Sequence, residues 1–146
     1  MSIDEWMDYV DMIEAKMVGD NVEHCIIKHR FADGMYMREA FMPKGSLAVS
    51  NIHNTTHPLV ILDGELRVRT HNGVKILSSG HLEITTPMTR RILYANLDTR
   101  FITFHALPDK DVKAIQDKIL VKRTNPLLSK FQLMQICEGI NRSNTI

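Results

Sequence analysis

The sequence is poor in cysteine, aromatic residues and long apolar runs, and neither sign of charge is in excess. Its two cysteines, Cys25 and Cys137, have no metal-type spacing, so we expect buried free thiols. No apolar run approaches the roughly 20 residues that span a bilayer, and the acidic N-terminus does not resemble a signal peptide. The formal net charge of +1 gives no reason to expect nucleic acid or an anionic membrane as partner. We therefore expect a soluble protein in a reducing compartment, the cytoplasm.

The chain has 146 residues, of which 44% are hydrophobic, so it can bury the core of one domain. Residues 1–20 are predicted to form an amphipathic helix. Ser2 and Glu5 fit a capping box, in which each side chain satisfies a free backbone amide of the first turn. We expect this helix to lie against the outside of the domain or against another subunit. Its apolar face comprises Ile3, Trp6, Val10, Ile13 and Met17.

Residues 21–108 show short apolar runs separated by frequent turn signals. The clearest hairpin is predicted at 71–74, because Asn72-Gly73 readily takes the positive φ angles of a tight turn. Many short strands without intervening helices are typical of a β-sandwich or barrel. We therefore predict a mainly β domain.

Residues 109–146 are predicted to be helical. A first helix begins at Pro108-Asp109 and is broken by Asn125-Pro126, and a second runs from Leu127 to about Glu138. Because both ends of the chain carry helices with an apolar face, we expect a homodimer or a higher homo-oligomer. The apolar residues of the first C-terminal helix are Val112, Ile115 and Ile119.

The segment from Gly45 to Gly64 places three polar residues at fixed intervals between two glycines. Asn51 and His53 share one face of a strand, and a turn at 54–56 can return His57 beside them. Polar side chains aimed together from neighbouring strands are how an all-β domain builds a metal or ligand site.

This segment resembles the first motif of the cupin superfamily, G(X)5HXH(X)3,4E(X)6G. The spacing agrees at every step, but Asn51 replaces the first histidine and His57 replaces the glutamate. The second motif, G(X)5PXG(X)2H(X)3N, is more degraded. Counted from Pro87, it places Ile92 at the last metal histidine. The resemblance implies a single cupin-type jelly-roll barrel.

Most of the chain also resembles a group of small cupin-like proteins encoded by tailed bacteriophages. This resemblance implies a host-cytoplasmic protein and adds His105 to the site. His53, His57 and His105 then either hold a divalent metal (zinc, iron, nickel or manganese) or line a metal-free polar pocket. The strings that carry the resemblance are Arg38-Glu39, Pro43-Lys-Gly45, Ile52-His53, His57, Pro87, Thr89-Arg90-Arg91, Tyr94-Ala95, Asp98-Thr99 and Thr103-Phe-His105.

An arginine near the histidines makes a small anionic ligand plausible, because guanidinium groups bind carboxylate or phosphate in two-point fashion. Ile92 stands at the family's ligand position, so its face of the strand is expected to point inward. Arg90 and Tyr94 share that face and are expected at the cavity, whereas Arg91 is expected to point outward. The alternative is that Arg90-Arg91 forms a solvated strand end. The candidate ligand-binding residues are Asn51, Arg90, Tyr94, Arg38 and Tyr36.

Three functions remain open at this stage. The first is a module that binds a small, anionic molecule, with or without a metal. The second is a metal-dependent cupin enzyme of the lyase, isomerase or dioxygenase type. Its catalytic residues are unknown, although Glu39 or Tyr94 can transfer protons if either reaches the cavity. The third is a structural or assembly role.

Overall fold

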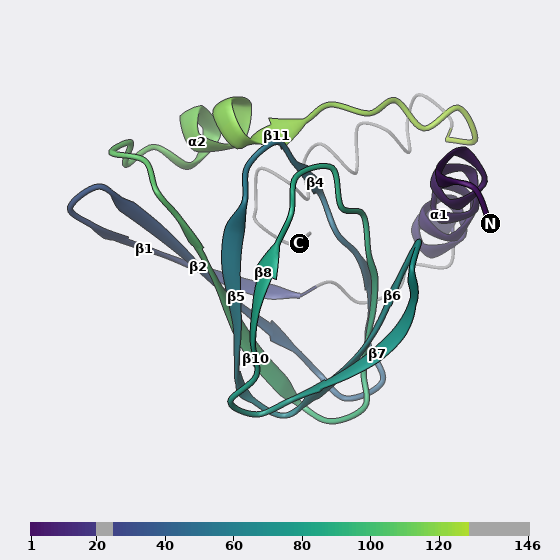
Figure 1. The fold of residues 1–146 in the computed structure, drawn as a ribbon, viewed down its shortest axis with the longest axis horizontal. Coiled ribbons are helices and arrows are strands. Elements are labelled where there is room, and N and C mark those ends of the chain that lie inside the picture. Colours follow the sequence, from purple (N-terminus) through teal and green to yellow (C-terminus); the bar gives the residue numbers. More distant parts are fainter. Residues whose placement is uncertain (20–24, 129–146) are drawn as a thin grey trace.

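The computed structural model describes residues 1–19 and 25–128. The described chain is mainly β, with one helix before the strands and one between the last two strands (Figure 1). The elements are α1 (Ile3–Gly19), β1 (Ile26–Ala32), β2 (Met35–Met42), β3 (Leu47–Val49), β4 (Ile52–His53), β5 (His57–Asp63), β6 (Glu65–Thr70), β7 (Gly73–Ser78), β8 (Leu82–Thr85), β9 (Ile92–Ala95), β10 (Thr99–His105), α2 (Val112–Ile119) and β11 (Leu120–Val121).

The strands form a five-stranded sheet, a four-stranded sheet and a short pair, and all the pairings are antiparallel. The strand orders are β1-β2-β10-β5-β8, β3-β9-β6-β7 and β11-β4. The two larger sheets curve around a common interior, and α2 with β11 lies across one end of the barrel (Figure 1). The jelly-roll predicted from the sequence is confirmed.

The barrel core follows the two-residue periodicity of the strands. Leu93 and Ala95 of β9 face the same interior as Ile61 of β5 and Phe101 of β10, and all four are fully buried. The expected 71–74 turn is confirmed, since Gly73 has a φ of 122° and β6 pairs with β7 on either side of it.

Helix α1 lies on the outer face of the barrel, as one of the two sequence-based alternatives predicted. The capping box is confirmed: Glu5 N donates to Ser2 Oγ and Ser2 N donates to Glu5 Oε2, both at 3.1 Å. Trp6 and Val10 pack against Val49 of β3 and Ile92 of β9. The apolar stripe of α1 therefore covers the four-stranded sheet.

Helix α2 begins at Val112, later than the predicted start at Pro108-Asp109, because Asp111 is its N-cap and accepts from the amide of Ala114 at 3.1 Å. It ends earlier than predicted, at Ile119 rather than near Asn125-Pro126. The reason is that Leu120 is extended and pairs with His53, so the chain leaves the helix to form β11. The predicted second C-terminal helix, apart from its first two positions, lies outside the described residues.

In the part of the chain that the structure describes, neither helix is long and apolar enough to cross a membrane.

Candidate metal and anion site

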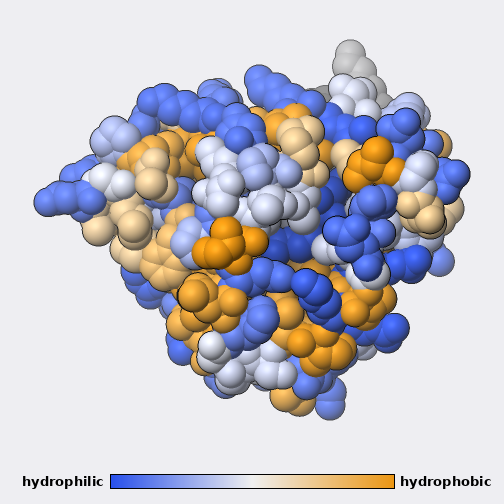
Figure 2. Space-filling view, viewed as in Figure 1, coloured by the Kyte–Doolittle hydropathy of each residue, from blue (hydrophilic) through white to orange (hydrophobic). Residues whose placement is uncertain are grey.

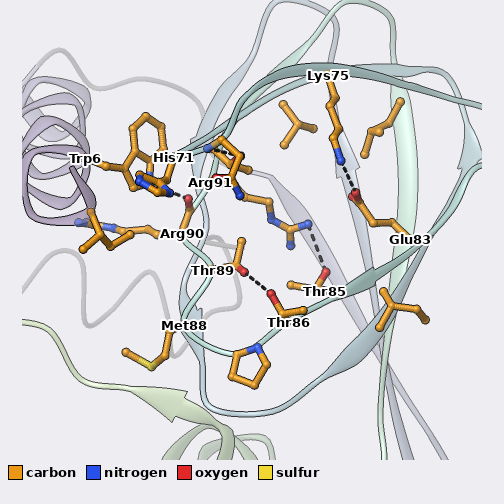
Figure 3. Close-up of a pocket in the computed structure, with 17 residues that line it drawn as sticks. Trp6, His71, Lys75, Glu83, Thr85, Thr86, Met88, Thr89, Arg90 and Arg91 are labelled. Atoms are coloured by element: carbon orange, nitrogen blue, oxygen red, sulfur yellow. Dashed lines mark hydrogen bonds and ion pairs between the residues drawn. The ribbon is translucent and has the colours of Figure 1, made fainter. Parts of the chain in front are cut away.

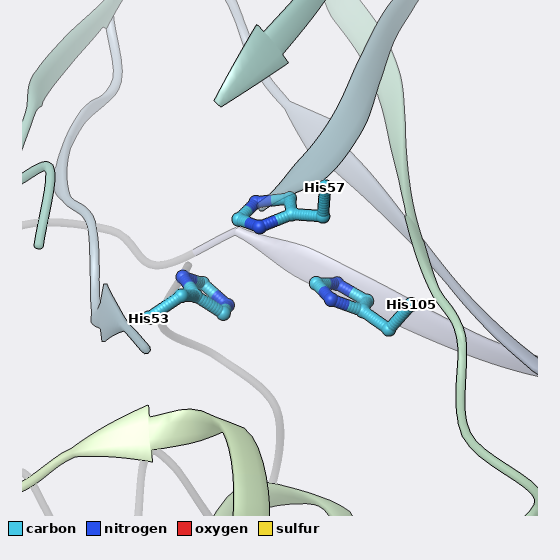
Figure 4. Close-up of side chains that lie close together, drawn as sticks. All are labelled: His53, His57 and His105. Atoms are coloured by element: carbon cyan, nitrogen blue, oxygen red, sulfur yellow. The ribbon is translucent and has the colours of Figure 1, made fainter. Parts of the chain in front are cut away.

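Three imidazoles from separate strands converge at the end of the barrel that α2 covers. His53 lies on β4, His57 begins β5 and His105 ends β10 (Figure 4). Their nearest ligand atoms all lie within 4.8 Å of one another. The ring centroids are 4.5 Å apart for His53–His57, 4.7 Å for His57–His105 and 5.3 Å for His53–His105. The structure thus brings together the three residues predicted as metal ligands.

Two of the rings are oriented by contacts that leave their other nitrogen available. His57 Nδ1 lies 3.3 Å from the carbonyl of Thr55, which can only accept, so Nδ1 carries the proton. His105 Nε2 contacts the Thr103 hydroxyl at 2.9 Å. The remaining atoms, His57 Nε2 and His105 Nδ1, are buried without a hydrogen-bond partner in residues 1–19 and 25–128. Such contacts commonly orient histidine ligands of metals.

The histidines are held neutral by their surroundings. Burial, together with the charges of His57 and His105, lowers the pKa of His53 to about 2. Burial and the His57 charge lower the pKa of His105 to about 3, and burial also lowers the pKa of His57. Neutral imidazole is the form that binds a metal, so the cluster is in the ligating state at neutral pH.

Tyr36 and Arg38 lie beside the cluster. The buried Tyr36 ring stacks on His105 with centroids 5.6 Å apart, and its hydroxyl contacts His29 Nδ1. Arg38 is buried and hydrogen-bonds Tyr36, and its charge helps to lower the pKa of both His53 and His105. Their part in ligand binding stays a prediction.

The expected directions of Arg90, Arg91 and Tyr94 are wrong. Arg90 turns to α1, where Nη1 donates to Asp11 at 2.6 Å and Nη2 pairs with Glu14 at 3.5 Å. Tyr94 is 42% exposed on the outer face of β9. Arg91, expected outside, is 4% exposed and donates from Nη1 to Thr85 at 3.4 Å (Figure 3). The predicted alternation of inward and outward residues along β9 is shifted by one position. Ile92 packs outward against α1, and Leu93 faces the core.

Arg91 is the residue that the sequence-based prediction missed, and a signal for it exists. The sequence-based prediction aligns the second cupin motif on Pro87, which places Ile92 at the motif histidine. Counted from Gly80, the same spacing places Met88 at the motif glycine and Arg91 at the motif histidine. Met88 has a φ of 66°, a backbone conformation that favours glycine. Arg91 also contributes charge that lowers the pKa of His53 and His57, so it lies close to them.

The other candidates lie as follows. Asn51 stands between β3 and β4, and its side-chain nitrogen is buried without a hydrogen-bond partner among the described residues. Glu39 forms an ion pair with Arg30 at 3.2 Å. Because it alternates with Arg38 along β2, it lies on the opposite face of the sheet. Neither Glu39 nor Tyr94 is therefore aimed at the histidines.

No family model matches the sequence, and no curated protein matches it. Solved structures do match. Ectoine synthase from P. lautus has a TM-score of 0.55 at 12% identity, over 74% of this chain and 81% of that one. A double-stranded β-helix protein from Klebsiella pneumoniae has a TM-score of 0.52 at 16% identity, over 64% and 90%. The cupin-2 domain of a transcriptional regulator from Enterobacter cloacae has a TM-score of 0.50 at 14% identity, over 60% and 100%.

These likenesses show that the chain has the cupin-type double-stranded β-helix fold. They confirm the fold that the motif spacing in 45–64 implied. At such identities the likeness concerns the fold alone. The resemblance to phage proteins is not tested by it and stays a prediction.

Proposed function

We propose that this chain binds a divalent transition metal through His53, His57 and His105 and holds a small anionic molecule next to it. The observation that carries the proposal is the meeting of three neutral imidazoles from three strands within 4.8 Å. A single ion with bonds of about 2.0–2.1 Å to each ring can bridge this span after small side-chain rotations. Three histidines leave coordination positions open for a ligand.

The partnerless nitrogens of His57 and His105 support a metal. A buried polar atom without a partner costs free energy, and a metal–nitrogen bond removes that cost. The same set suits zinc, iron, nickel or manganese, since imidazole binds all of them. A bound ion would supply a Lewis acid that fixes and polarises an anionic ligand.

The charge around the cluster supports an anionic ligand. Two buried guanidinium groups, those of Arg38 and Arg91, lie close enough to affect the histidine pKa values. A metal adds further positive charge. The ligand that such a site favours carries negative charge on oxygen.

Binding is favoured over catalysis because Glu39 and Tyr94, the two residues considered for proton transfer, point elsewhere. A metal-dependent cupin enzyme of the lyase, isomerase or dioxygenase type is the second candidate. The observation that favours it is the buried Tyr36, whose ring stacks on His105. The phage resemblance extends the proposal to a role during infection, with the protein acting as a homo-oligomer in the host cytoplasm.

The test is elemental analysis of tag-free protein, followed by calorimetric titration of EDTA-treated protein with Zn²⁺, Mn²⁺, Ni²⁺ and Fe²⁺. We expect one site per chain in the native protein and none in His53→Ala or His105→Ala. The matched control is His81→Ala, because His81 is exposed on the turn before β8. A native protein that neither retains nor binds any of these ions would refute the metal site.

A further inference from the structure

A cleft of about 440 Å³ opens between the edge strands of the two large sheets. Its walls include Lys75 and Leu77 of β7, Glu83 and Thr85 of β8, and Trp6 of α1. The surface in Figure 2 is hollowed near its centre, between the strands that Figure 1 labels β8 and β7. The barrel interior is therefore reached from the side, whereas α2 covers the histidine end.

Arg91 lines this cleft and uses little of its hydrogen-bonding capacity on residues 1–19 and 25–128. Its guanidinium group points across the cavity toward Thr85 (Figure 3), and that contact is long, at 3.4 Å. Its Nε is buried and has no hydrogen-bond partner among the residues the structure describes. A guanidinium group presents five donors in a planar fork, so it can take a two-oxygen acceptor.

The charge of Arg91 is also weakly compensated. Glu83, the acidic residue that lines the cleft, acts on Arg91 through its charge, but it is shared with Lys75, with which it forms an ion pair at 3.5 Å. The neighbouring Arg90, by contrast, has both Asp11 and Glu14 as partners. A buried cation whose counter-ion is shared with another cation still costs free energy, and an anionic ligand offsets that cost.

The rest of the lining is amphipathic. Ile3, Ile84 and Met88 are the exposed apolar residues of the lining, and Thr85 and Thr86 supply hydroxyl groups near the arginine. This combination suits a ligand with one anionic end and an apolar body. An inorganic anion would leave the apolar wall without a partner.

We propose that Arg91 binds the carboxylate of a small organic acid through its guanidinium fork, with the apolar part of the acid lying along the apolar lining of the cleft. This deepens the proposed function by naming the ligand class. The carboxylate contact itself needs no metal, so the two proposals can be tested separately.

The experiment is calorimetric titration of EDTA-treated and zinc-treated protein with hexanoate, with neutral hexanamide and with inorganic phosphate. Trp6 is the one tryptophan of the chain and lines the cleft, so its fluorescence reports whether the ligand binds there. We expect millimolar or tighter binding of hexanoate with a change in Trp6 emission. Hexanamide and phosphate should bind more weakly.

The key variant is Arg91→Met, which keeps an unbranched stem of similar length to the arginine's and removes the fork. Loss of a charge-assisted bond should weaken hexanoate about 10- to 100-fold. Arg91→Lys, which keeps the charge, should recover only part of the affinity. The matched control is Arg67→Met, because Arg67 is exposed on β6 and should leave binding unchanged.

Absence of hexanoate binding at millimolar concentration, equal binding of hexanamide, or unchanged affinity in a folded Arg91→Met would each overturn the inference. Hexanoate binding in EDTA-treated protein that takes up no metal would sustain the inference while the metal site fails. Metal binding without hexanoate binding would leave the metal site standing and remove the carboxylate site.

Discussion

Arg90 and Arg91 are adjacent in the chain, but their guanidinium groups lie on opposite sides of the segment that enters β9. Arg90 is buried under α1, where Asp11 and Glu14 neutralise it. Arg91 lies in the side cleft of the barrel with a long contact to Thr85. Two neighbouring cations therefore have different physical roles: one fixes the helix, and the other is available to a ligand.

Asp11→Asn should destabilise the protein strongly. The carboxylate of Asp11 is buried and accepts from Arg90 Nη1 at 2.6 Å and from Arg123 Nη2 at 2.8 Å. Removing the Asp11 charge leaves the buried Arg90 with Glu14 as its remaining counter-ion, at 3.5 Å, and breaking a buried ion pair costs about 3–5 kcal/mol. Urea unfolding followed by Trp6 fluorescence measures the change. Asp8→Asn is the control, since its exposed carboxylate is 3.8 Å from Arg123 and should contribute less than about 1 kcal/mol.

The contribution of Asp11 should also depend on pH. Burial alone would raise the pKa of Asp11, but hydrogen bonds from Arg123 and Arg90 and their charges lower it below the usual 3.8. A carboxyl with a lowered pKa stabilises the folded state above its unfolded pKa, and this stabilisation is lost as pH falls through the folded value. The difference in unfolding free energy between wild type and Asp11→Asn should therefore be constant above about pH 5 and shrink below about pH 4. A difference that grows toward acid would contradict the lowered pKa.

Gly64→Ala should be among the most damaging small substitutions in the barrel. A Cβ at Gly64 would lie 2.3 Å from the carbonyl oxygen of Asp98 and 2.5 Å from Thr99 Oγ1, and φ is +98°. We expect a loss of more than about 3 kcal/mol, because backbone strain and overlap add. Gly73→Ala is the control: φ is +122° but a Cβ meets nothing within 4 Å, so strain alone applies. Thermal unfolding should rank Gly64→Ala well below Gly73→Ala, and equal values would argue against the close approach.

Met88→Gly should stabilise the protein slightly. Met88 has a φ of 66° and is mostly exposed, so its side chain contributes little packing while the backbone is strained. Relief of about 1–2 kcal/mol is partly offset by the entropy of glycine, about 0.5–1 kcal/mol. The net gain should be measurable as a rise in the midpoint of thermal unfolding. Thr89→Gly, next in the chain without a positive φ, should instead lower it.

Local patterns in the sequence predicted much of the fold. The Ser2–Glu5 capping box and the hairpin at Gly73 depend on residues close in the chain, and both are confirmed. The meeting of His53 and His57 followed from the cupin spacing and strand alternation, and the resemblance to the phage-encoded group added His105. The capping box and the hairpin were predicted correctly because they do not depend on the register of distant strands.

The direction of Arg90, Arg91 and Tyr94 did depend on register, and it was predicted wrongly. A count that begins at Pro87 rather than Gly80 shifts the strand by one residue, which exchanges its two faces. The side cleft was not predicted either. Its walls come from β7, β8 and α1, and which strands form the open edges is decided by the whole topology.

Few backbone contacts hold His53 in place, because β4 has only two residues. On one side Leu120 of β11 pairs with His53, and on the other the amide of Met88 donates to the His53 carbonyl at 2.8 Å. The segment after α2 is thus a wall of the histidine cluster rather than an appendage to the barrel. A chain cut off at Ile119 would keep His57 and His105 on long strands but lose half of the support that aims the third imidazole at them.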